Sequence, residues 1–349
     1  MTTLHTLAID AMGGDHAPQS VVAGLALAAE RHPNMRFVLV GDAARLTPLL
    51  ARHKRAADVC TLAHAPNVVG ADMKVAQALR LRDSSLRAAI DLVAGGQAAG
   101  AVSAGNTGAI MAIAKLVLKT VPGIDRPAIA AIGPSARGDI VMLDLGANLE
   151  CDARNLVEFA IMGDAFARAV LGLTHPTLGL LNVGSEEQKG VESLRQAAEI
   201  LRNGHLAGQF AGFVEGHDIA AGTTDIVVSD GFSGNVALKT GEGALRLMAD
   251  LLRQVFRTDL ASRLGYLLAR PGLERLREWL DPRRYNGAVL LGLNGVVVKS
   301  HGGTDEEGFA AAVSVAADMI DHRFDRLIRA GLDKLNPDAP AGARKAAFG

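Results

Sequence analysis

Three glycine-rich turns carry the residues best suited to binding an anion. They contain Gly13-Gly14, Gly105-Asn106-Thr107-Gly108 and Gly231-Phe-Ser233-Gly234-Asn235. Each turn precedes a helical sequence pattern, and the backbone N–H groups at the start of a helix attract negative charge. None has the glycine spacing of a dinucleotide fingerprint or a Walker loop. A single turn of this kind is more often a plain loop, but three of them, with amide and hydroxyl side chains, predict a phosphate or oxyanion pocket.

Four aspartates lie beside these turns or at the ends of apolar runs: Asp10, Asp15, Asp144 and Asp230. A bare carboxylate facing phosphate would repel it, so we expect these side chains to orient hydrogen-bond donors or to hold loop amides. For Asp10 and Asp15, closing the turn as a structural cap is an equal alternative.

The turns follow short apolar runs that predict strands, and helical patterns follow the turns. The predicted strands cover residues 4–9, 37–40, 100–103, 140–143, 178–182 and 226–228. Strands that alternate with helices predict an α/β fold of three layers, α/β/α, with a mainly parallel sheet. Because the carboxyl ends of parallel strands share one edge of the sheet, we expect all the turns to gather there in a single anion-binding cup.

Composition restricts the class of protein. Of the 349 residues 49% are hydrophobic and only 4% aromatic, and the formal net charge is −1, which gives no global signal for nucleic acid. Two isolated cysteines, Cys60 and Cys151, make neither a disulfide framework nor a zinc site, so we expect a reducing compartment and no metal. The sequence has no signal-peptide pattern, and its apolar segment 287–298 is too short to span a bilayer, so we expect a cytoplasmic protein.

A basic helical segment interrupts the strand pattern between residues 245 and 285. It holds nine arginines and five acidic residues, and its leucines follow helical spacing, with a break predicted at Pro271-Gly272. The segment could dock an acidic partner, rest on an anionic membrane, or simply bury its leucines against the body or a second subunit. We expect one catalytic α/β domain over residues 1–331, with 245–285 as an excursion, and a loose tail over 332–349.

Several short strings occur in a fixed order from the first strand to about residue 330. They are Ile9-Asp-Ala-Met-Gly-Gly-Asp15, Ser84-Ser85, Ser103-Ala-Gly-Asn-Thr-Gly-Ala109, Asp144-Leu-Gly-Ala-Asn148 with Cys151, Asp230-Gly-Phe-Ser-Gly-Asn235 and Ser300-His-Gly-Gly303. This ordered set resembles the phosphate acyltransferase family of bacterial glycerolipid synthesis. The resemblance implies a fold akin to isocitrate and isopropylmalate dehydrogenases and to phosphotransacetylases. It also implies a homodimer that associates peripherally with the inner face of the cell membrane.

The activity implied by the resemblance joins acyl-[acyl carrier protein] and inorganic phosphate to give an acyl phosphate and free carrier protein, for phospholipid synthesis and without a cofactor. Phosphate is already a nucleophile at neutral pH, so the site must hold an anion and stabilise an oxyanion. By motif, Lys189 is expected to pair with the phosphate charge and Asn235 to donate to phosphate or oxyanion. His301 could protonate the departing thiolate, although a bond to its own loop is the slightly favoured alternative.

The remaining expected contacts fall into two sets. Phosphate or substrate is assigned to Gly13, Gly14, Gly105, Asn106, Thr107, Asn148, Ser233 and Gly234. Membrane or carrier contact is assigned to Arg253, Arg257, Leu260, Arg263, Leu264 and Leu268.

Other functions stay open at this point. The chain could be a phosphotransacetylase-like enzyme that uses CoA thioesters, or a non-enzymatic protein that binds the carrier or the membrane. A decarboxylating dehydrogenase would need an aspartate cluster for a metal, and the sequence shows none. Cys151 could form an acyl-enzyme if a base or positive surroundings activated its thiol, but no histidine is near it in sequence.

Overall fold

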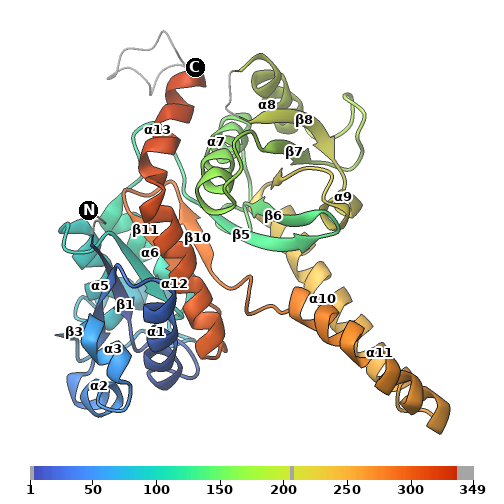
Figure 1. Ribbon diagram of the computed structural model, residues 1–349. Helices are drawn as coiled ribbons and strands as arrows, with labels where there is room; N and C mark the ends of the chain where they lie inside the picture. Colours follow the sequence, from blue (N-terminus) through green and yellow to red (C-terminus); the bar gives the residue numbers. More distant parts are fainter. Residues whose placement is uncertain (1–3, 205–207, 336–349) are drawn as a thin grey trace.

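The computed structural model describes residues 4–204 and 208–335, and in this part of the chain the strands form one sheet with helices on both faces (Figure 1). The eleven strands described are β1 (His5–Asp10), β2 (Met35–Gly41), β3 (Cys60–His64), β4 (Gly100–Ser103), β5 (Ala128–Ser135), β6 (Gly138–Leu143), β7 (Thr177–Leu181), β8 (Gln209–Val214), β9 (Ile226–Val228), β10 (Ala288–Leu291) and β11 (Val296–Lys299). Their order is β3-β2-β1-β4-β11-β10-β5-β6-β9-β7-β8.

Most of the strand pairs are parallel. Within the described residues seven pairs are parallel, whereas β10–β11, β10–β5 and β5–β6 are antiparallel. The predicted α/β class with a mainly parallel sheet is therefore confirmed. The antiparallel pairs lie in the middle of the sheet, so the group β3, β2, β1, β4 and β11 runs opposite to the group β6, β9, β7 and β8.

Alternation along the strands supplies an apolar surface to each face of the sheet. In β1, Leu7 and Ile9 pack into the larger core cluster, and Ala8 between them packs on the other face. The larger cluster is covered by α1 (Gln19–Arg31), α2 (Ala43–Leu50), α3 (Lys54–Val59), α7 (Ala153–Val170), α8 (Glu192–Asn203), α12 (Glu306–Asp321) and α13 (Phe324–Leu335). The other face is covered by α4 (Val75–Arg80), α5 (Ser85–Ala94), α6 (Thr107–Leu118), α9 (Gly216–Ala221) and the start of α10 (Gly231–Val255).

Helices α10 and α11 (Leu260–Trp279) form the predicted excursion and project from the body (Figure 1). Several of their leucines are exposed: the exposed fractions of Leu260, Leu264 and Leu268 are 81%, 60% and 78%. The break predicted at Pro271 is wrong, because Pro271 lies inside a continuous α11 and the turn falls between the two helices, at residues 256–259. An exposed helix tolerates an internal proline at a cost of about 3 kcal/mol, because only one backbone hydrogen bond is lost.

No helix within residues 4–204 and 208–335 combines the length and apolar character that crossing a bilayer requires. Helix α13 continues to Leu335, which takes it into the first residues of the segment expected to be loose. The rest of that segment lies outside the described residues.

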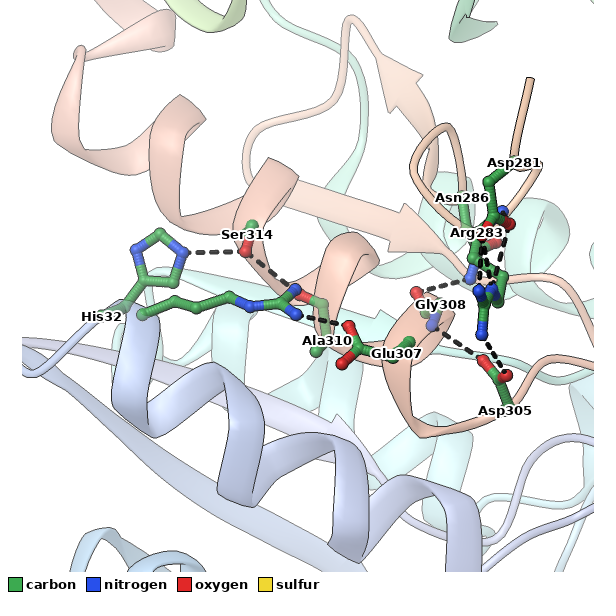
Figure 2. A network of polar contacts seen from close by, with 10 residues as sticks. His32, Asp281, Arg283, Asn286, Asp305, Glu307, Gly308, Ala310 and Ser314 are labelled. Atoms are coloured by element: carbon green, nitrogen blue, oxygen red, sulfur yellow. Dashed lines mark hydrogen bonds and ion pairs between the residues drawn. The ribbon is translucent and has the colours of Figure 1, made fainter. Parts of the chain in front are cut away.

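Polar contacts tie the return of the excursion to the body (Figure 2). Arg283 bonds both Asp281, at 2.5 Å, and Asp305, at 3.2 Å, and Asp305 is the N-cap of α12. Helix α12 is in turn joined to the end of α1, where Arg31 pairs with Glu307. The excursion is therefore anchored on the first half of the sheet, although α10 begins in the second half.

Candidate active site

The predicted site residues form two groups instead of one cup. Because the two parallel groups of strands run in opposite directions, their carboxyl ends belong to opposite edges of the sheet. The turns after β1, β4 and β11 form the first group, and the turns after β6, β7 and β9 form the second. The expectation of a single shared edge is therefore wrong, and each group has its own hollow.

The first hollow has a volume of about 490 Å³ and lies between the turns after β1 and β4. Gly14, Asp15, Asn106 and Thr107 line it together with apolar side chains such as Val69. This is the point where the chain order reverses around β1, with β2 on one side and β4 on the other, and open α/β sheets bind ligands in such crevices.

Asp10 holds together the turns after β1 and β4, which form the first hollow. Its carboxylate is buried and accepts a hydrogen bond of 2.6 Å from the Ser103 hydroxyl and one of 3.2 Å from the Met12 amide. Burial raises the pKa of Asp10, and the donors around it oppose that shift. A Cβ atom added to Gly13 would lie 2.8 Å from the Gly105 nitrogen, so glycine is needed where the two turns touch. This placement agrees with the expected supporting role of Asp10.

Asn106 and Thr107, which are both expected to bind a ligand here, differ in the hydrogen-bonding groups that remain available for one. Asn106 is the N-cap of α6: its side-chain oxygen accepts from the Ala109 amide at 3.0 Å, and its Nδ2 donates to Ala71 at 2.5 Å. Thr107 is exposed at the first position of the helix, beside the N–H groups that open α6. The start of α6 can therefore attract an anion through its backbone, with Asn106 as the cap that shapes it.

The turn after β11 closes the first hollow through Gly302, whose carbonyl accepts the Asp15 amide at 2.8 Å. Buried Asn286 fixes this turn by accepting the His301 amide at 2.8 Å and donating to the Ser300 hydroxyl at 2.8 Å. Asn286 also donates to the Gly308 carbonyl at the start of α12 (Figure 2). The His301 ring is exposed, and its Nδ1 accepts the Gly303 amide, which leaves Nε2 to carry the ring proton.

Asp144 holds the turns of the second group together, as Asp10 does in the first group. It is fully buried, and its Oδ1 accepts the amides of Ile129 at 2.8 Å and Ala147 at 3.1 Å. Its Oδ2 accepts the backbone amide of Asn148 at 2.7 Å and the side-chain Nδ2 of Asn148 at 2.9 Å. That Nδ2 also donates to Pro127 at 2.8 Å, so both of its hydrogens are engaged inside the protein. The geometry makes Asn148 a support for the loop.

The turn after β9 brings Asp230, Ser233 and Asn235 to the start of α10. Asp230 is the N-cap, and it accepts the Ser233 amide at 2.8 Å and the Ser233 hydroxyl at 2.9 Å. A Cβ atom on Gly234 would lie 2.0 Å from the Asp144 carbonyl oxygen, so the two turns are in close contact. Asn235 is exposed and uses one amide hydrogen to bond the Leu145 carbonyl at 3.0 Å, which leaves its other hydrogen and its oxygen for a ligand.

Lys189 lies on the exposed turn after β7. Its Nζ pairs with the Glu186 carboxylate at 2.9 Å, and this partner raises the pKa of Lys189. Its backbone carbonyl accepts from Asn182, which keeps the turn folded. The ammonium therefore faces a carboxylate in this structure and would have to exchange it for phosphate to act as expected.

The second hollow has a volume of about 560 Å³ and combines apolar walls with a polar rim. Leu149, Val191 and Phe232 line it and are largely exposed, and Asp230 and Ser233 lie at its rim. Cys151 also lines this hollow. Burial raises the pKa of the Cys151 thiol to about 12, and the charges of Asp144 and Asp230 add to the shift. These surroundings oppose the thiolate that an acyl-enzyme would need.

Some supporting residues were not found from the sequence. The sequence places Ser103 in a predicted strand and at the start of the string Ser103-Ala-Gly-Asn-Thr-Gly-Ala109 but assigns it no role. Asn286 is not singled out, although a lone asparagine before an apolar strand is a recognisable loop-fixing residue. Lys299 ends β11 directly after three valines and is partly buried. Within residues 4–204 and 208–335, no group of three or more His, Cys, Asp or Glu is arranged to hold a metal ion.

Comparison with known proteins identifies the family. A family described as "Fatty acid synthesis protein" matches residues 5–326. A phosphate acyltransferase of Granulibacter bethesdensis is 70% identical over 94% of this chain and 89% of its own length. A phosphate acyltransferase of Gluconacetobacter diazotrophicus is 66% identical over 97% of this chain and 91% of its own length.

Solved structures share the fold at low sequence identity. The EutD phosphotransacetylase from Staphylococcus aureus has a TM-score of 0.60 and 16% identity, covering 90% of this chain and 94% of that one. A 4-hydroxythreonine-4-phosphate dehydrogenase from Klebsiella pneumoniae has a TM-score of 0.53 and 15% identity, covering 92% and 98%. The predicted likeness to phosphotransacetylase and dehydrogenase folds is confirmed. With the curated relatives matched over nearly their whole length, the chain belongs to the phosphate acyltransferase family.

Proposed function

We propose that this enzyme transfers a fatty acyl group from the thioester of an acyl carrier protein to inorganic phosphate, and so supplies acyl phosphate for phospholipid synthesis. The observation that carries the proposal is the 70% identity over 94% of the chain to a protein named phosphate acyltransferase. The geometry supports it, because both hollows offer amide and hydroxyl donors and neither is built around a paired acid and base.

The reaction does not need a side chain that removes a proton to activate the nucleophile. Phosphate attacks the thioester carbonyl without prior deprotonation, so the enzyme contributes positioning and charge stabilisation. In our proposal Asn235 uses its remaining amide hydrogen to bind phosphate or the oxyanion, and Lys189 leaves Glu186 to neutralise the phosphate. His301 belongs to the first group of turns and carries its ring proton on Nε2, so it can protonate the departing thiolate only where the carrier thioester reaches that group.

The apolar walls of the second hollow suit a fatty acyl chain. Leu149, Val191 and Phe232 surround a space of about 560 Å³ beside the turn that carries Asn235. Burying such surfaces against an alkyl chain gains about 25 cal/mol per Å². An acetyl group would leave most of these walls in water, which favours a long-chain acyl donor over acetyl-CoA.

The projecting helices account for the remaining part of the proposal, in which the protein is cytoplasmic and rests on the inner face of the membrane. Leu260, Leu264 and Leu268 are exposed on α11, and Arg257 and Arg263 lie close to them in sequence. Leucines that enter the interface, with arginines beside anionic head groups, are a known mode of peripheral binding. The exposed leucines farther up α10 suit a second copy of the chain in a homodimer, and the arginines, Arg253 included, also suit the acidic carrier protein.

One assay separates the donors. The purified enzyme is mixed with inorganic phosphate and either palmitoyl carrier protein or acetyl-CoA, and acyl phosphate is trapped as the hydroxamate. We expect product with the carrier thioester and at most about 1% of that rate with acetyl-CoA, because the small acyl group forgoes the apolar contacts. Product with acetyl-CoA alone would refute the proposed donor.

A further inference from the structure

The turn after β11 carries His301 and closes the first hollow. Its Gly302 carbonyl accepts the Asp15 amide at 2.8 Å, which joins it to the turn after β1. The His301 amide donates to Oδ1 of Asn286 at 2.8 Å. Asn286 lies in the connection between α11 and β10, so the backbone of His301 is fixed by a side chain from a different part of the chain.

The side-chain amide of Asn286 is buried and its donors are directed into the protein (Figure 2). Its Nδ2 donates to the Gly308 carbonyl at 2.7 Å and to the Ser300 hydroxyl at 2.8 Å, and the Thr304 hydroxyl lies 3.3 Å away. An amide nitrogen has two N–H donors, so both are used inside the protein. Asn286 can therefore act on the reaction only through the groups that it holds.

Asn286 is itself held in place by the start of α12. A Cβ atom on Gly308 would lie 3.2 Å from Nδ2 of Asn286, so this helix packs directly against the amide. Arg283, three residues before Asn286, bonds Asp305, the N-cap of α12, at 3.2 Å. The connection that carries Asn286 is therefore tied to α12 at two points, and the amide has a fixed place from which to hold His301 (Figure 2).

The orientation of the exposed His301 ring depends on the same turn. Nδ1 of the ring accepts the Gly303 amide at 3.2 Å, and the His301 carbonyl accepts the Thr304 amide at 3.2 Å. These bonds orient the ring relative to its own backbone, whereas the bond to Asn286 fixes that backbone relative to the sheet. A shift of about 1 Å in a reacting group can cost about 100-fold in rate, so the second kind of bond matters as much as the first.

We propose that Asn286 is a positioning residue of the acyl-transfer reaction, which places Nε2–H of His301 beside the departing sulfur through its bond to the His301 amide. This inference rests on the proposed function, in which His301 serves the departing thiolate. The electron pair of the C–S bond leaves with the sulfur, which takes up one proton. Hydrogen phosphate gives up one proton as its oxygen bonds the acyl carbon, so the ring ends the reaction as it began.

A double-mutant cycle of Asn286→Ala and His301→Gln tests the inference on the full-length enzyme. The cycle measures kcat and the KM for phosphate with the acyl carrier thioester as donor. Asn294→Ala is the matched control, because Asn294 lies just before the other end of β11 and fixes that loop in the same way. Its Nδ2 donates to the carbonyls of Leu118 at 3.1 Å and Thr120 at 2.8 Å.

We expect kcat to fall about 100-fold in His301→Gln and at least about tenfold in Asn286→Ala, with the KM for phosphate changed by less than about twofold. In the His301→Gln background, Asn286→Ala should lower kcat by less than about twofold, because the group that it positions is already gone. Asn294→Ala should keep kcat in both backgrounds, although it lowers the urea midpoint.

Two results of the cycle would overturn the inference. If Asn286→Ala lowers kcat by the same factor in both backgrounds, the residue acts through stability or through another group. If His301→Gln keeps the wild-type kcat, the histidine leaves Asn286 nothing to position. Should Asn286→Ala not fold, Asn286→Ser takes its place in the cycle, because its shorter side chain also leaves the His301 amide without its acceptor.

The ring of His301 reports on its position without turnover. At alkaline pH, ¹⁵N NMR of the labelled ring should show Nδ1 as an acceptor and Nε2 carrying the proton in the wild type and in Asn294→Ala, and a mixture of tautomers in Asn286→Ala. A wild type that shows this contrast but makes no acyl phosphate refutes the proposed function and leaves the positioning of His301 standing. An active wild type whose cycle is additive does the reverse.

Discussion

Replacing Gly234 or Gly241 by alanine is the same chemical change in the same helix, and we expect opposite effects. A Cβ atom at Gly234 would lie 2.0 Å from the Asp144 carbonyl oxygen and 2.5 Å from the Ser229 hydroxyl. A Cβ atom at Gly241 would meet nothing within 4 Å. The pair therefore isolates the contact between the turns after β6 and β9 from the helix propensity of α10.

The magnitudes follow from these distances. Carbon and oxygen need roughly 3.2 Å or more, so Gly234→Ala must displace the turn after β6 by about 1 Å. Four N–H donations hold the Asp144 carboxylate and resist that shift. We expect the free energy of unfolding to fall by about 2–4 kcal/mol, after a helix-propensity gain of up to about 1 kcal/mol. Gly241→Ala has only the gain and should raise it by about 0.5–1 kcal/mol.

Urea unfolding followed by far-UV circular dichroism measures both variants against the wild type. The Gly234→Ala protein that does fold should also show turnover reduced at least about tenfold, because Asn235 moves with its neighbour. A Gly234→Ala protein as stable as the wild type would show that the two turns are not in contact, and the reasoning fails. A destabilised Gly241→Ala protein would show instead that this face of α10 packs against another molecule.

Three other predictions use different parts of the molecule. Changing Leu264 and Leu268 to Glu together should weaken binding to anionic vesicles about 30-fold or more, because burying each exposed leucine contributes about 1–2 kcal/mol to binding. Turnover on soluble substrate should be nearly unchanged. Unchanged sedimentation with vesicles would remove the membrane role. Cys151, whose thiol has a pKa of about 12, should react with iodoacetamide roughly a thousandfold more slowly at pH 8 than a cysteine at the ordinary pKa of 9.0, and Cys151→Ala should keep acyl transfer. Rapid alkylation at pH 8 would contradict the burial of the thiol. Lys189→Ala and Asn235→Ala should each lower turnover about tenfold or more while urea midpoints stay within error, and full activity in both would leave the second group of turns without a role in the reaction.

The strand–turn–helix units could be predicted because a short, continuous stretch of sequence determines each of them. A short apolar run, a turn with Gly13-Gly14 or Gly105, and a helical period follow one another, and the structure has β1, β4 and β9 where these signals stand. The direction in which distant strands pair is not local. Residues 288–299 form a single apolar segment in the sequence, but Gly292 and Gly295, both at positive φ, turn it into the antiparallel pair β10 and β11.

The antiparallel pairs in the middle of the sheet explain why the expected single cup is divided into two groups of turns. The antiparallel β5–β6 pair turns at Ala136-Arg137 and sets the second group of strands running against the first. Hydrophobic pattern fixes which side chains are buried and carries no information on whether two strands far apart in sequence run in the same direction. The turns were located correctly, and their assembly was not.

The use of each polar side chain was also beyond the sequence. Asn106, Asn148 and Asn235 all follow strands in similar turns, and each could cap a helix or bind a ligand. In the structure Asn106 caps α6, Asn148 is held by Asp144, and Asn235 keeps a free donor. A short amide satisfies the nearest backbone group first, and which group is nearest depends on the fold.

Each half of the sheet uses a buried aspartate to hold two turns together, and this role limits which residues can react. Asp10 ends β1 and Asp144 directly follows β6, and both are buried. Each lies beside a serine on the neighbouring strand, Ser103 at the end of β4 or Ser229 directly after β9, and a capped helix begins shortly after that serine. The Asp10 carboxylate already accepts one O–H and one N–H donor, and the Asp144 carboxylate accepts four N–H donors. Each carboxylate therefore holds two turns in register and is shielded from the hollow. Removing either carboxylate should therefore act through displaced turns, with loss of stability alongside loss of turnover. Neutralising a lysine that faces an anion should reduce turnover with little loss of stability, and this contrast separates support from chemistry in a site without a titrating pair.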